Sequence, residues 1–174
     1  MWESITILMG PPGSGKTTLG THVSQKQPET SFVSVGGYMR GILGLKPPFE
    51  NVDRQKVFKS IIFNHFALQK NKHLIIDCNP FPGEMWNAVL DHLHLFKKKR
   101  FILIDTPMDV LGDRLSKRNR DDEEGFPFQK RIDYYQKNVF PAIQSLSNTL
   151  NLEHFSNKTP RDIDTFLIFL NNKL

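Results

Sequence analysis

The feature that most limits how this chain can fold is the run GPPGSGKT at residues 10–17. It follows residues 5–9, which are mostly apolar and predict a short buried strand, and it precedes a segment in which Leu19 and Val23 share one helical face. Glycines let a backbone turn closely around a phosphate, and the N-terminus of the next helix directs N–H groups toward it. Strand, loop and helix together predict a phosphate-binding loop.

This loop supplies the groups that would hold a nucleotide triphosphate. The Lys16 ammonium would reach the β and γ phosphates, and the Thr17 hydroxyl would ligate Mg²⁺. ATP and Mg²⁺ are therefore the expected cofactors. A glycine-rich turn that binds nothing is the alternative, and it leaves the match at eight motif positions unexplained. The residues expected to contact the donor nucleotide here are Gly10, Pro11, Pro12, Gly13, Ser14, Gly15, Lys16, Thr17 and Thr18.

Strand-like and helix-like segments alternate along the rest of the chain. Segments at residues 31–35, 74–77, 101–105 and, more weakly, 150–155 predict further strands. The alternation predicts an α/β protein with the P-loop NTPase fold, in which about five parallel strands are sandwiched by helices. Ligands of such sheets bind at the carboxyl ends of the strands. The apolar positions that predict helices are Val57, Phe58, Ile61, Ile62 and Phe66; Met85, Val89 and Leu93; Ile132, Tyr135, Val139 and Ile143; and Ile163, Phe166, Leu167 and Leu170.

Chain length and cysteine content limit the domain organisation and the compartment. The 174 residues are most simply one domain, 1–174. Cys78 is the only cysteine, which excludes an internal disulfide and a cysteine-rich zinc site and favours a reducing compartment. We see no long apolar run and no signal-peptide arrangement at the N-terminus. We expect a cytoplasmic monomer that does not bind a membrane.

The charge balance favours anionic ligands. The chain has 23 basic and 18 acidic residues and a formal net charge of +5. Its densest basic run, residues 97–100 (KKKR), contains no aromatic residue, and we expect it to form a solvated helix end. Small-molecule nucleotides are therefore expected as partners in preference to nucleic acid.

Two aspartates end predicted strands. Asp77 follows a buried strand, where an acid in phosphate-loop enzymes holds Mg²⁺ directly or through water and so completes what Thr17 begins. Its alternative role is to cap a turn. Asp105 ends the neighbouring strand before a Thr-Pro pair, and for this residue a turn role and a site role both stay open.

A cluster of arginines follows the fourth strand. Arg114 and Arg118 lie four apart and share a helical face, and Arg120 and Arg131 come after them. Arginines can clamp the charge that concentrates on a transferring phosphoryl group. The acids at residues 121–124 could instead neutralise these arginines in a salt-bridged surface segment.

In this order, the motifs resemble those of the adenylate kinase family, the nucleoside monophosphate kinases of the phosphate-loop class. Residues 10–18 are similar to its G-x-P-G-S-G-K-[GT]-T opening, and residues 74–77 are similar to the strand that leads into D-G-[FY]-P-R. Residues 113–118 (DRLSKR) resemble the D-R-L-x-x-R helix. Residues 120–124 (RDDEE) together with Arg131 resemble the lid stretch R-x-D-D-x-x-E and a later arginine.

The resemblance implies roles for residues on the donor side. Arg114 would face the donor base, and residues 157–160 (NKTP) look like the loop around the adenine, which places Lys158 there. The residues implied to act on the transferring phosphates are Lys16, Arg118, Arg120 and Arg131. The lid, residues 118–128, is short, and Gly125 and Pro127 within it make the helix that carries Arg131 begin near Phe128.

The acceptor side departs from the family pattern. Val35 and Gly37 stand where the family's T-G-D-x-x-R has threonine and aspartate, whereas Gly36 and Arg40 match and are the expected acceptor-binding residues. Phe81 stands where D-G-[FY]-P-R has the acceptor arginine. The acceptor arm, residues 36–72, is also shorter than usual.

The motifs together predict a kinase that moves the γ-phosphoryl group of ATP to a nucleoside monophosphate. Within the same class, the acceptor could be another small molecule or an RNA 5′ end, because the acceptor motifs are altered. A nucleotide-binding regulatory protein with little transfer activity is the alternative from a different class. Three arginines placed for transfer argue against that alternative, since ATP binding alone hardly needs them.

Overall fold

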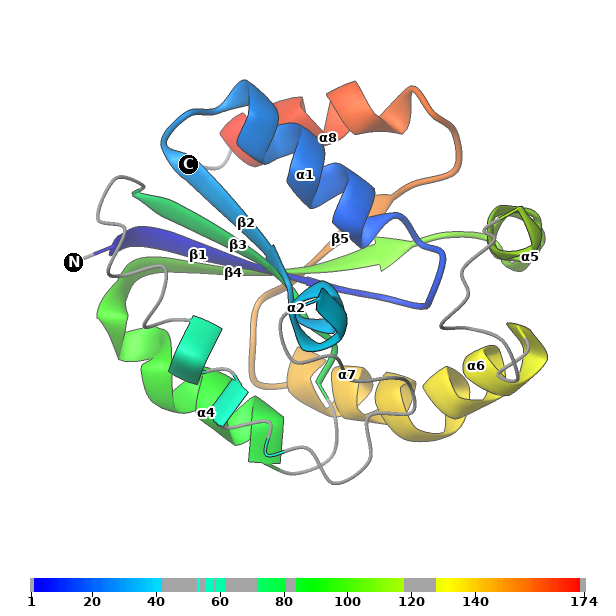
Figure 1. The fold of residues 1–174 in the computed structure, drawn as a ribbon, viewed down its shortest axis with the longest axis horizontal. Coiled ribbons are helices and arrows are strands. Elements are labelled where there is room, and N and C mark those ends of the chain that lie inside the picture. Colours follow the sequence, from blue (N-terminus) through cyan, green and yellow to red (C-terminus); the bar gives the residue numbers. More distant parts are fainter. Residues whose placement is uncertain are drawn as a thin grey trace.

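A parallel β-sheet forms the centre of the molecule (Figure 1). The structure is a computed structural model that describes residues 2–41, 53, 56–57, 59–61, 72–80, 84–117 and 128–172. Five strands pair in the order β2-β3-β1-β4-β5, and every pairing is parallel, as the sequence predicts. The strands are β1 (Trp2–Met9), β2 (Thr30–Ser34), β3 (His73–Asp77), β4 (Phe96–Asp105) and β5 (Leu152–Ser156).

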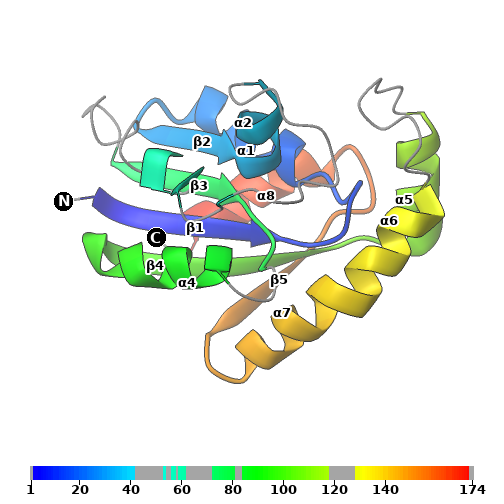
Figure 2. The same ribbon diagram turned by 60° about the horizontal axis from the view of Figure 1, so that its bottom comes forward.

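Helices cover both faces of this sheet, which confirms the predicted α/β architecture. On one face lie α1 (Lys16–Lys26) and α8 (Asp162–Asn171). On the other lie α4 (Glu84–His92), α6 (Phe128–Tyr134) and α7 (Phe140–Ser147) (Figures 1 and 2). A short helix follows two of the strands: α2 (Val35–Gly41) comes after β2, and α5 (Met108–Ser116) comes after β4.

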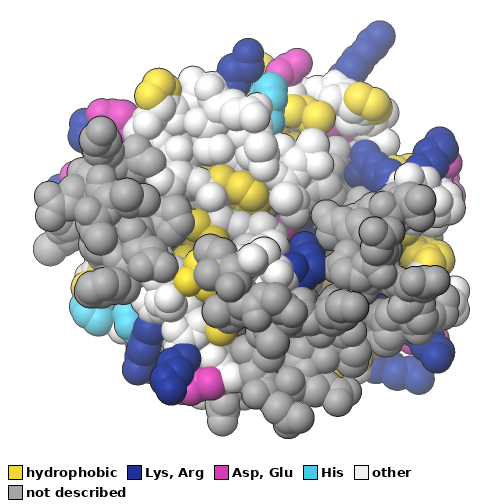
Figure 3. All heavy atoms as spheres, viewed as in Figure 1, with side chains coloured by type: hydrophobic (Ala, Val, Ile, Leu, Met, Phe, Trp, Pro, Cys, Tyr) yellow, Lys and Arg dark blue, Asp and Glu magenta, His cyan; other side chains and the backbone are white. Residues whose placement is uncertain are grey.

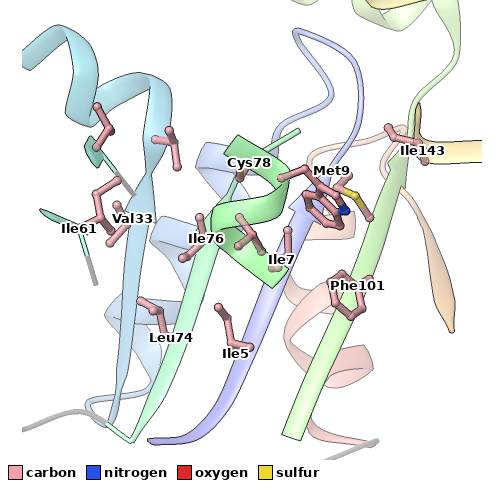
Figure 4. Close-up of a cluster of buried hydrophobic side chains, with 14 of the residues drawn as sticks. Ile5, Ile7, Met9, Val33, Ile61, Leu74, Ile76, Cys78, Phe101 and Ile143 are labelled. Atoms are coloured by element: carbon pink, nitrogen blue, oxygen red, sulfur yellow. The ribbon is translucent and has the colours of Figure 1, made fainter. Parts of the chain in front are cut away.

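Each face of the sheet buries its own hydrophobic core. Figure 4 shows the larger one, where β-branched and aromatic side chains of the strands meet α4 and α7. Trp86 of α4 packs there with its ring edge-on to Phe101, 6.1 Å between centroids, and Cys78 is a buried member of the same cluster. In the smaller core, Leu19 and Val23 of α1 pack with Phe166 and other apolar residues of α8 and the sheet. The cores fix the strands whose carboxyl ends carry the site.

One continuous helical segment runs from α6 to α7. Its described part begins with α6 at Phe128, and its predicted apolar stripe from Ile132 to Ile143 is buried. Between the two helices, residues Tyr135–Val139 form a π-helix. Pro141 has no N–H to donate to the Lys137 carbonyl, which gives a local reason for the wider turn. Of the predicted helix around Val57 and Ile61, both residues are described and buried, whereas Phe58, Ile62 and Phe66 lie outside the described residues.

The prediction for the basic run at residues 97–100 is wrong. The run lies inside β4 and not at a helix end. Its three lysines are exposed, but Arg100 is buried: its Nε and Nη2 donate to the two carboxylate oxygens of Glu153 at 2.8 and 3.0 Å, and its Nη1 donates to the Leu170 carbonyl at 2.9 Å. Arg100 thus ties β4 to β5 and α8, a packing role that the local charge pattern does not reveal.

On the face shown in Figure 3, the described Lys and Arg side chains are scattered and do not gather into one band. Among the described residues, no helix combines the length and the apolar composition needed to cross a membrane.

Candidate active site at the carboxyl edge of the sheet

Residues 10–15 turn tightly between β1 and α1. Gly10 and Gly15 have φ angles of 141° and 90°, a region that residues with a side chain rarely adopt. A Cβ placed on Gly10 would lie 2.7 Å from the carbonyl oxygen of Ile104, and one on Gly15 would collide with the Asn157 amide. Both glycines are therefore required by the backbone path and by the neighbouring strand ends.

Lys16, the first residue of α1, folds back onto its own loop. Its Nζ donates hydrogen bonds to the carbonyl oxygens of Gly10 and Pro11, both at 2.9 Å, and lies 3.4 Å from the Ser14 hydroxyl. Burial lowers the pKa of the Lys16 ammonium, and the negative charge of Asp77 opposes this effect only in part. The lysine is thus already at the loop and is held by carbonyl oxygens that an incoming phosphate could replace.

Thr17 and Asp77, both expected to ligate Mg²⁺, lie in contact. The Thr17 hydroxyl donates to Asp77 Oδ2 at 2.7 Å, although 60 residues separate them in the chain. Thr17 is exposed and Asp77 is half-buried, so both oxygens are accessible from the edge of the sheet. Ser34, at the end of β2, lies 3.4 Å from the same carboxylate oxygen. A carboxylate and a hydroxyl are oxygen ligands of the kind that Mg²⁺ takes, with water and substrate phosphates completing its shell.

Two asparagines hold the loop from the neighbouring strand ends, and the sequence analysis assigned no role to either contact. Asn79 accepts from the Gly10 N–H at 2.8 Å and donates to the Gly10 carbonyl at 2.9 Å. Asn157, which is 4% exposed, donates to the Ser14 carbonyl at 2.7 Å. Asn157 directly follows β5 and Asn79 lies two residues after β3, both of which are strands that the sequence predicts. No local motif, however, marks an asparagine whose side chain bonds to a distant main chain.

The end of β4 is joined to β5. The carboxylate of Asp105 lies 2.8 Å from His154 Nδ1, and its carbonyl accepts from the Asn157 N–H at 2.8 Å. The next residue, Thr106, donates to the Asn157 carbonyl at 3.1 Å. Of the two roles left open for Asp105, these contacts favour the structural one, because they anchor the segment that carries Asn157.

The expected acceptor residues lie on α2. The guanidinium of Arg40 packs over the start of the helix, and a Cβ placed on Gly36 would lie 3.3 Å from Arg40 Nη1. The Gly37 N–H donates to the Ser34 hydroxyl at 3.2 Å. Through Ser34, α2 is therefore linked to the carboxylate of Asp77. Phe81, which stands in place of the family's acceptor arginine, lies outside the described residues.

The predicted arginines are described only in part. Arg114 lies on α5, and its Nη1 would be 3.7 Å from a Cβ placed on Gly15. This nitrogen is buried without a hydrogen-bond partner in the described part of the chain. Arg131 lies on α6, whereas Arg118 and Arg120, with most of the predicted lid, lie outside the described residues.

Lys158 follows β5 directly after Asn157. Its side chain is exposed, and its N–H donates to the carboxylate of Asp162 at 2.7 Å, as does the N–H of Thr159. These two bonds hold the Asp162 carboxylate at the start of α8 and lower its pKa. Lys158 thus lies on the short turn between β5 and α8, next to Asn157, whose side chain bonds to the phosphate loop.

Comparison with known proteins identifies the family and the fold. A family model described as "AAA domain" matches residues 5–142. An adenylate kinase of Encephalitozoon cuniculi (strain GB-M1) is 29% identical over 154 residues, covering 83% of this chain and 84% of that protein. An adenylate kinase of Prochlorococcus marinus (strain MIT 9301) is 26% identical over 182 aligned residues, covering 97% of each protein.

Two solved structures share the fold. A shikimate kinase from Bacteroides thetaiotaomicron has a TM-score of 0.62 at 15% identity, covering 98% of this chain and 97% of that one. An unliganded sugar kinase from Janibacter sp. HTCC2649 has a TM-score of 0.57 at 18% identity, covering 98% and 95%. The fold is thus a P-loop kinase fold. The relatives and neighbours together support a kinase activity, and they differ in the acceptor that their names give.

Proposed function

The chain belongs to the AAA domain family, and from this premise we propose that it is a magnesium-dependent kinase that transfers the γ-phosphoryl group of ATP to a nucleoside monophosphate. The observation that carries the proposal is the 2.7 Å contact between the Thr17 hydroxyl and the Asp77 carboxylate, beside the Lys16 ammonium. A cation, a hydroxyl and a carboxylate at one loop are the groups that phosphoryl transfer from ATP requires. The similarity to adenylate kinases supports the choice of acceptor.

On the donor side, the loop binds the phosphates of ATP. The loop N–H groups and the N-terminus of α1 surround the negative charge, and the Lys16 ammonium leaves the Gly10 and Pro11 carbonyls to bind the β and γ phosphates. Arg114, whose buried Nη1 lacks a partner in the described part of the chain, contacts the donor nucleotide next to the loop. Lys158 lies on the turn that borders the base.

The Thr17 hydroxyl and the Asp77 carboxylate suit Mg²⁺, because this ion commonly takes only one or two protein oxygens and completes its shell with water and substrate phosphates. When bound, Mg²⁺ neutralises charge on the β and γ phosphates and fixes their orientation. We expect Asp77→Asn to raise the Mg²⁺ concentration needed for half-maximal turnover by about tenfold, because an amide replaces a charged oxygen ligand. A magnesium titration of ADP release measures this value. Turnover and magnesium dependence equal to those of the wild type would return Asp77 to a turn-capping role.

Transfer itself needs no covalent enzyme intermediate. An oxygen of the acceptor attacks the γ phosphorus in line, the bond to the β–γ bridging oxygen breaks, and ADP leaves with the electron pair. We propose that Arg118, Arg120 and Arg131 stabilise the charge on the group in transit. Binding of both nucleotides before transfer aligns the reacting atoms.

The acceptor end departs furthest from the family pattern, and its residues suggest a specific alternative. Gly36 and Arg40 support binding of an acceptor phosphate on α2. Gly37 and Phe81, however, replace an aspartate and an arginine of the family pattern. A kinase for another small acceptor, or for an RNA 5′ end, is therefore the second candidate.

A coupled assay of ADP release separates these candidates. The panel contains each nucleoside monophosphate, shikimate, common sugars and a short 5′-hydroxyl RNA, with ATP alone as the blank. We expect acceptor-dependent release with at least one nucleoside monophosphate. Release with only a sugar, shikimate or RNA would assign the second candidate. ATP binding without release on any acceptor would favour the regulatory protein.

A further inference from the structure

The Asn79 side chain pairs with Gly10 as a neighbouring strand would. Its amide oxygen accepts from the Gly10 N–H at 2.8 Å and its amide nitrogen donates to the Gly10 carbonyl at 2.9 Å. Just before this, the Cys78 N–H donates to the Leu8 carbonyl at 3.1 Å. The pairing of β1 with β3 thus passes from main chain to side chain at the residue where the loop begins. A primary amide can donate and accept in one plane, which few other side chains can do.

Asn157 holds the other end of the same loop. Its amide nitrogen donates to the Ser14 carbonyl at 2.7 Å, and the side chain is buried. Its own main chain is fixed on both sides, because its N–H donates to the Asp105 carbonyl and its carbonyl accepts from Thr106. Side-chain amides from outside the loop therefore bond to it near both ends, at Gly10 and at Ser14.

From these contacts we infer that Asn79 and Asn157 are positioning residues that hold the empty phosphate loop in the shape that receives a triphosphate. This inference rests on the proposed use of ATP. Neither side chain is assigned a contact with the nucleotide. Both act through the carbonyl groups of the loop, which they keep turned away from the phosphate site so that the N–H groups face it.

The shared Gly10 carbonyl shows why nucleotide affinity depends on Asn79. In the empty loop this oxygen accepts from both Lys16 Nζ and Asn79 Nδ2, each at 2.9 Å. When Lys16 moves to the phosphates, Asn79 remains as the donor. Without Asn79, departure of the lysine would leave the Gly10 carbonyl without a donor. The free-energy cost of that unpaired carbonyl would weaken nucleotide binding. The Ser14 carbonyl accepts from Asn157 Nδ2 at 2.7 Å and from the Thr106 hydroxyl at 3.4 Å. Asn157 thus gives the shorter of these two bonds and fixes the direction in which this carbonyl points.

Calorimetry with Asn79→Ala and Asn157→Ala tests the inference. MgATP and inorganic tripolyphosphate, which has no base, are titrated into each full-length variant well below its melting temperature. Asn138→Ala is the matched control, because Asn138 Nδ2 also donates to a main-chain carbonyl, that of Tyr134, but on an exposed helix turn. We expect each loop variant to bind both ligands about tenfold more weakly, and the control to bind them as the wild type does.

The outcomes distinguish positioning from stability. A lower melting temperature with unchanged dissociation constants would overturn the inference, because the asparagines would then support only the fold. Weaker ATP binding with unchanged tripolyphosphate binding would also overturn it. If Asn157→Ala does not fold, the half-buried Asn79 decides the matter alone. A wild type that binds ATP but phosphorylates no acceptor would refute the proposed function and leave this inference intact, whereas a wild type that binds neither ligand would overturn both.

Discussion

The phosphate loop and α2 lie at the same edge of the sheet, but the chain builds them differently (Figure 1). Carbonyl groups of the loop at Gly10 and Ser14 are fixed by side chains from the ends of β3 and β5. The helix α2 has seven residues and meets the loop's carboxylate partner, Asp77, through the single hydroxyl of Ser34. The donor site is part of the sheet, whereas the acceptor residues lie on a short element joined to it.

This difference indicates which of the two sites, the donor site or the acceptor site, can vary in sequence. A change in the loop would disturb the ladder of β1 and the packing of two neighbouring strands. In α2, Val35 and Met39 are buried in the core, whereas Gly36, Gly37 and Arg40 are only half-buried. A change at these three positions would alter one short helix, in which each glycine already costs about 1 kcal/mol of helix propensity relative to alanine. The acceptor end is therefore free to diverge while the donor end keeps its form, which is the pattern that the motif departures follow.

The largest effect should follow removal of the donor-side cation. We expect Lys16→Ala to lower turnover by about three orders of magnitude, because it removes the positive charge from the β and γ phosphates. The fold should persist, since burial already disfavours the charged lysine in the empty protein. ADP release and circular dichroism measure the two properties, with the exposed Lys26→Ala of the same helix as the control. Wild-type turnover in a folded Lys16→Ala protein would refute the assignment of the loop.

Removal of Arg131 should have the next largest effect. We expect Arg131→Ala to lower turnover by about a hundredfold at saturating substrates and to change the ATP dissociation constant much less, because the arginine acts on charge that develops during transfer. Lys130→Ala, the exposed neighbour on α6, controls for loss of a positive charge. If affinity fell and turnover did not, Arg131 would serve ground-state binding, and the regulatory alternative would gain support.

Much of the donor half could be predicted because its signals are local. The run at residues 10–17 specified a strand, a turn and a helix, and period and composition identified all five strands. The parallel sheet then explains why Thr17 and Asp77 meet, since the carboxyl ends of parallel strands share one edge. That step needed only strand order, not any detail of side-chain packing.

The remaining features depend on contacts that no local pattern encodes. Asn79 reaches Gly10 across 69 residues and Asn157 reaches Ser14 across 143, and a single asparagine after a strand is also common in ordinary turns. Arg100 looked like part of a solvated basic run until β5 supplied Glu153 as its buried partner. The roles of these side chains depend on tertiary contacts, because the partner that a charged group or an amide meets in the fold determines what it does.

The pH dependence of ATP binding should sharpen the contrast by isolating Lys16. Burial lowers the pKa of this ammonium below its ordinary 10.5. As the pH rises toward 10.5, Lys16 therefore loses its proton in the empty folded protein before it does so in the unfolded chain. ATP affinity should then fall by up to about tenfold per pH unit, because binding must take up a proton. Stability of the empty protein should move in the opposite direction, since the unfolded chain binds more protons in this window. Calorimetry and urea unfolding measure the two trends, and Lys16→Ala should show neither. Parallel trends in that variant would place the titration on another group.

The smallest effect should come from Ser34, the hydroxyl that joins the two regions. Ser34→Ala removes the acceptor of the Gly37 N–H at the start of α2 and the 3.4 Å contact with Asp77. Loss of such a cap costs about 1 kcal/mol, which corresponds to roughly a fivefold change in an equilibrium constant. We expect the Michaelis constant for the acceptor to rise by about this factor while that for ATP stays unchanged, because the loop keeps its own anchors. Ser24→Ala, whose hydroxyl donates to the Thr21 carbonyl within α1, is the control. An equal rise in both Michaelis constants would mean that Ser34 acts through Asp77 on the donor, and that the two regions are coupled more tightly than their contacts indicate.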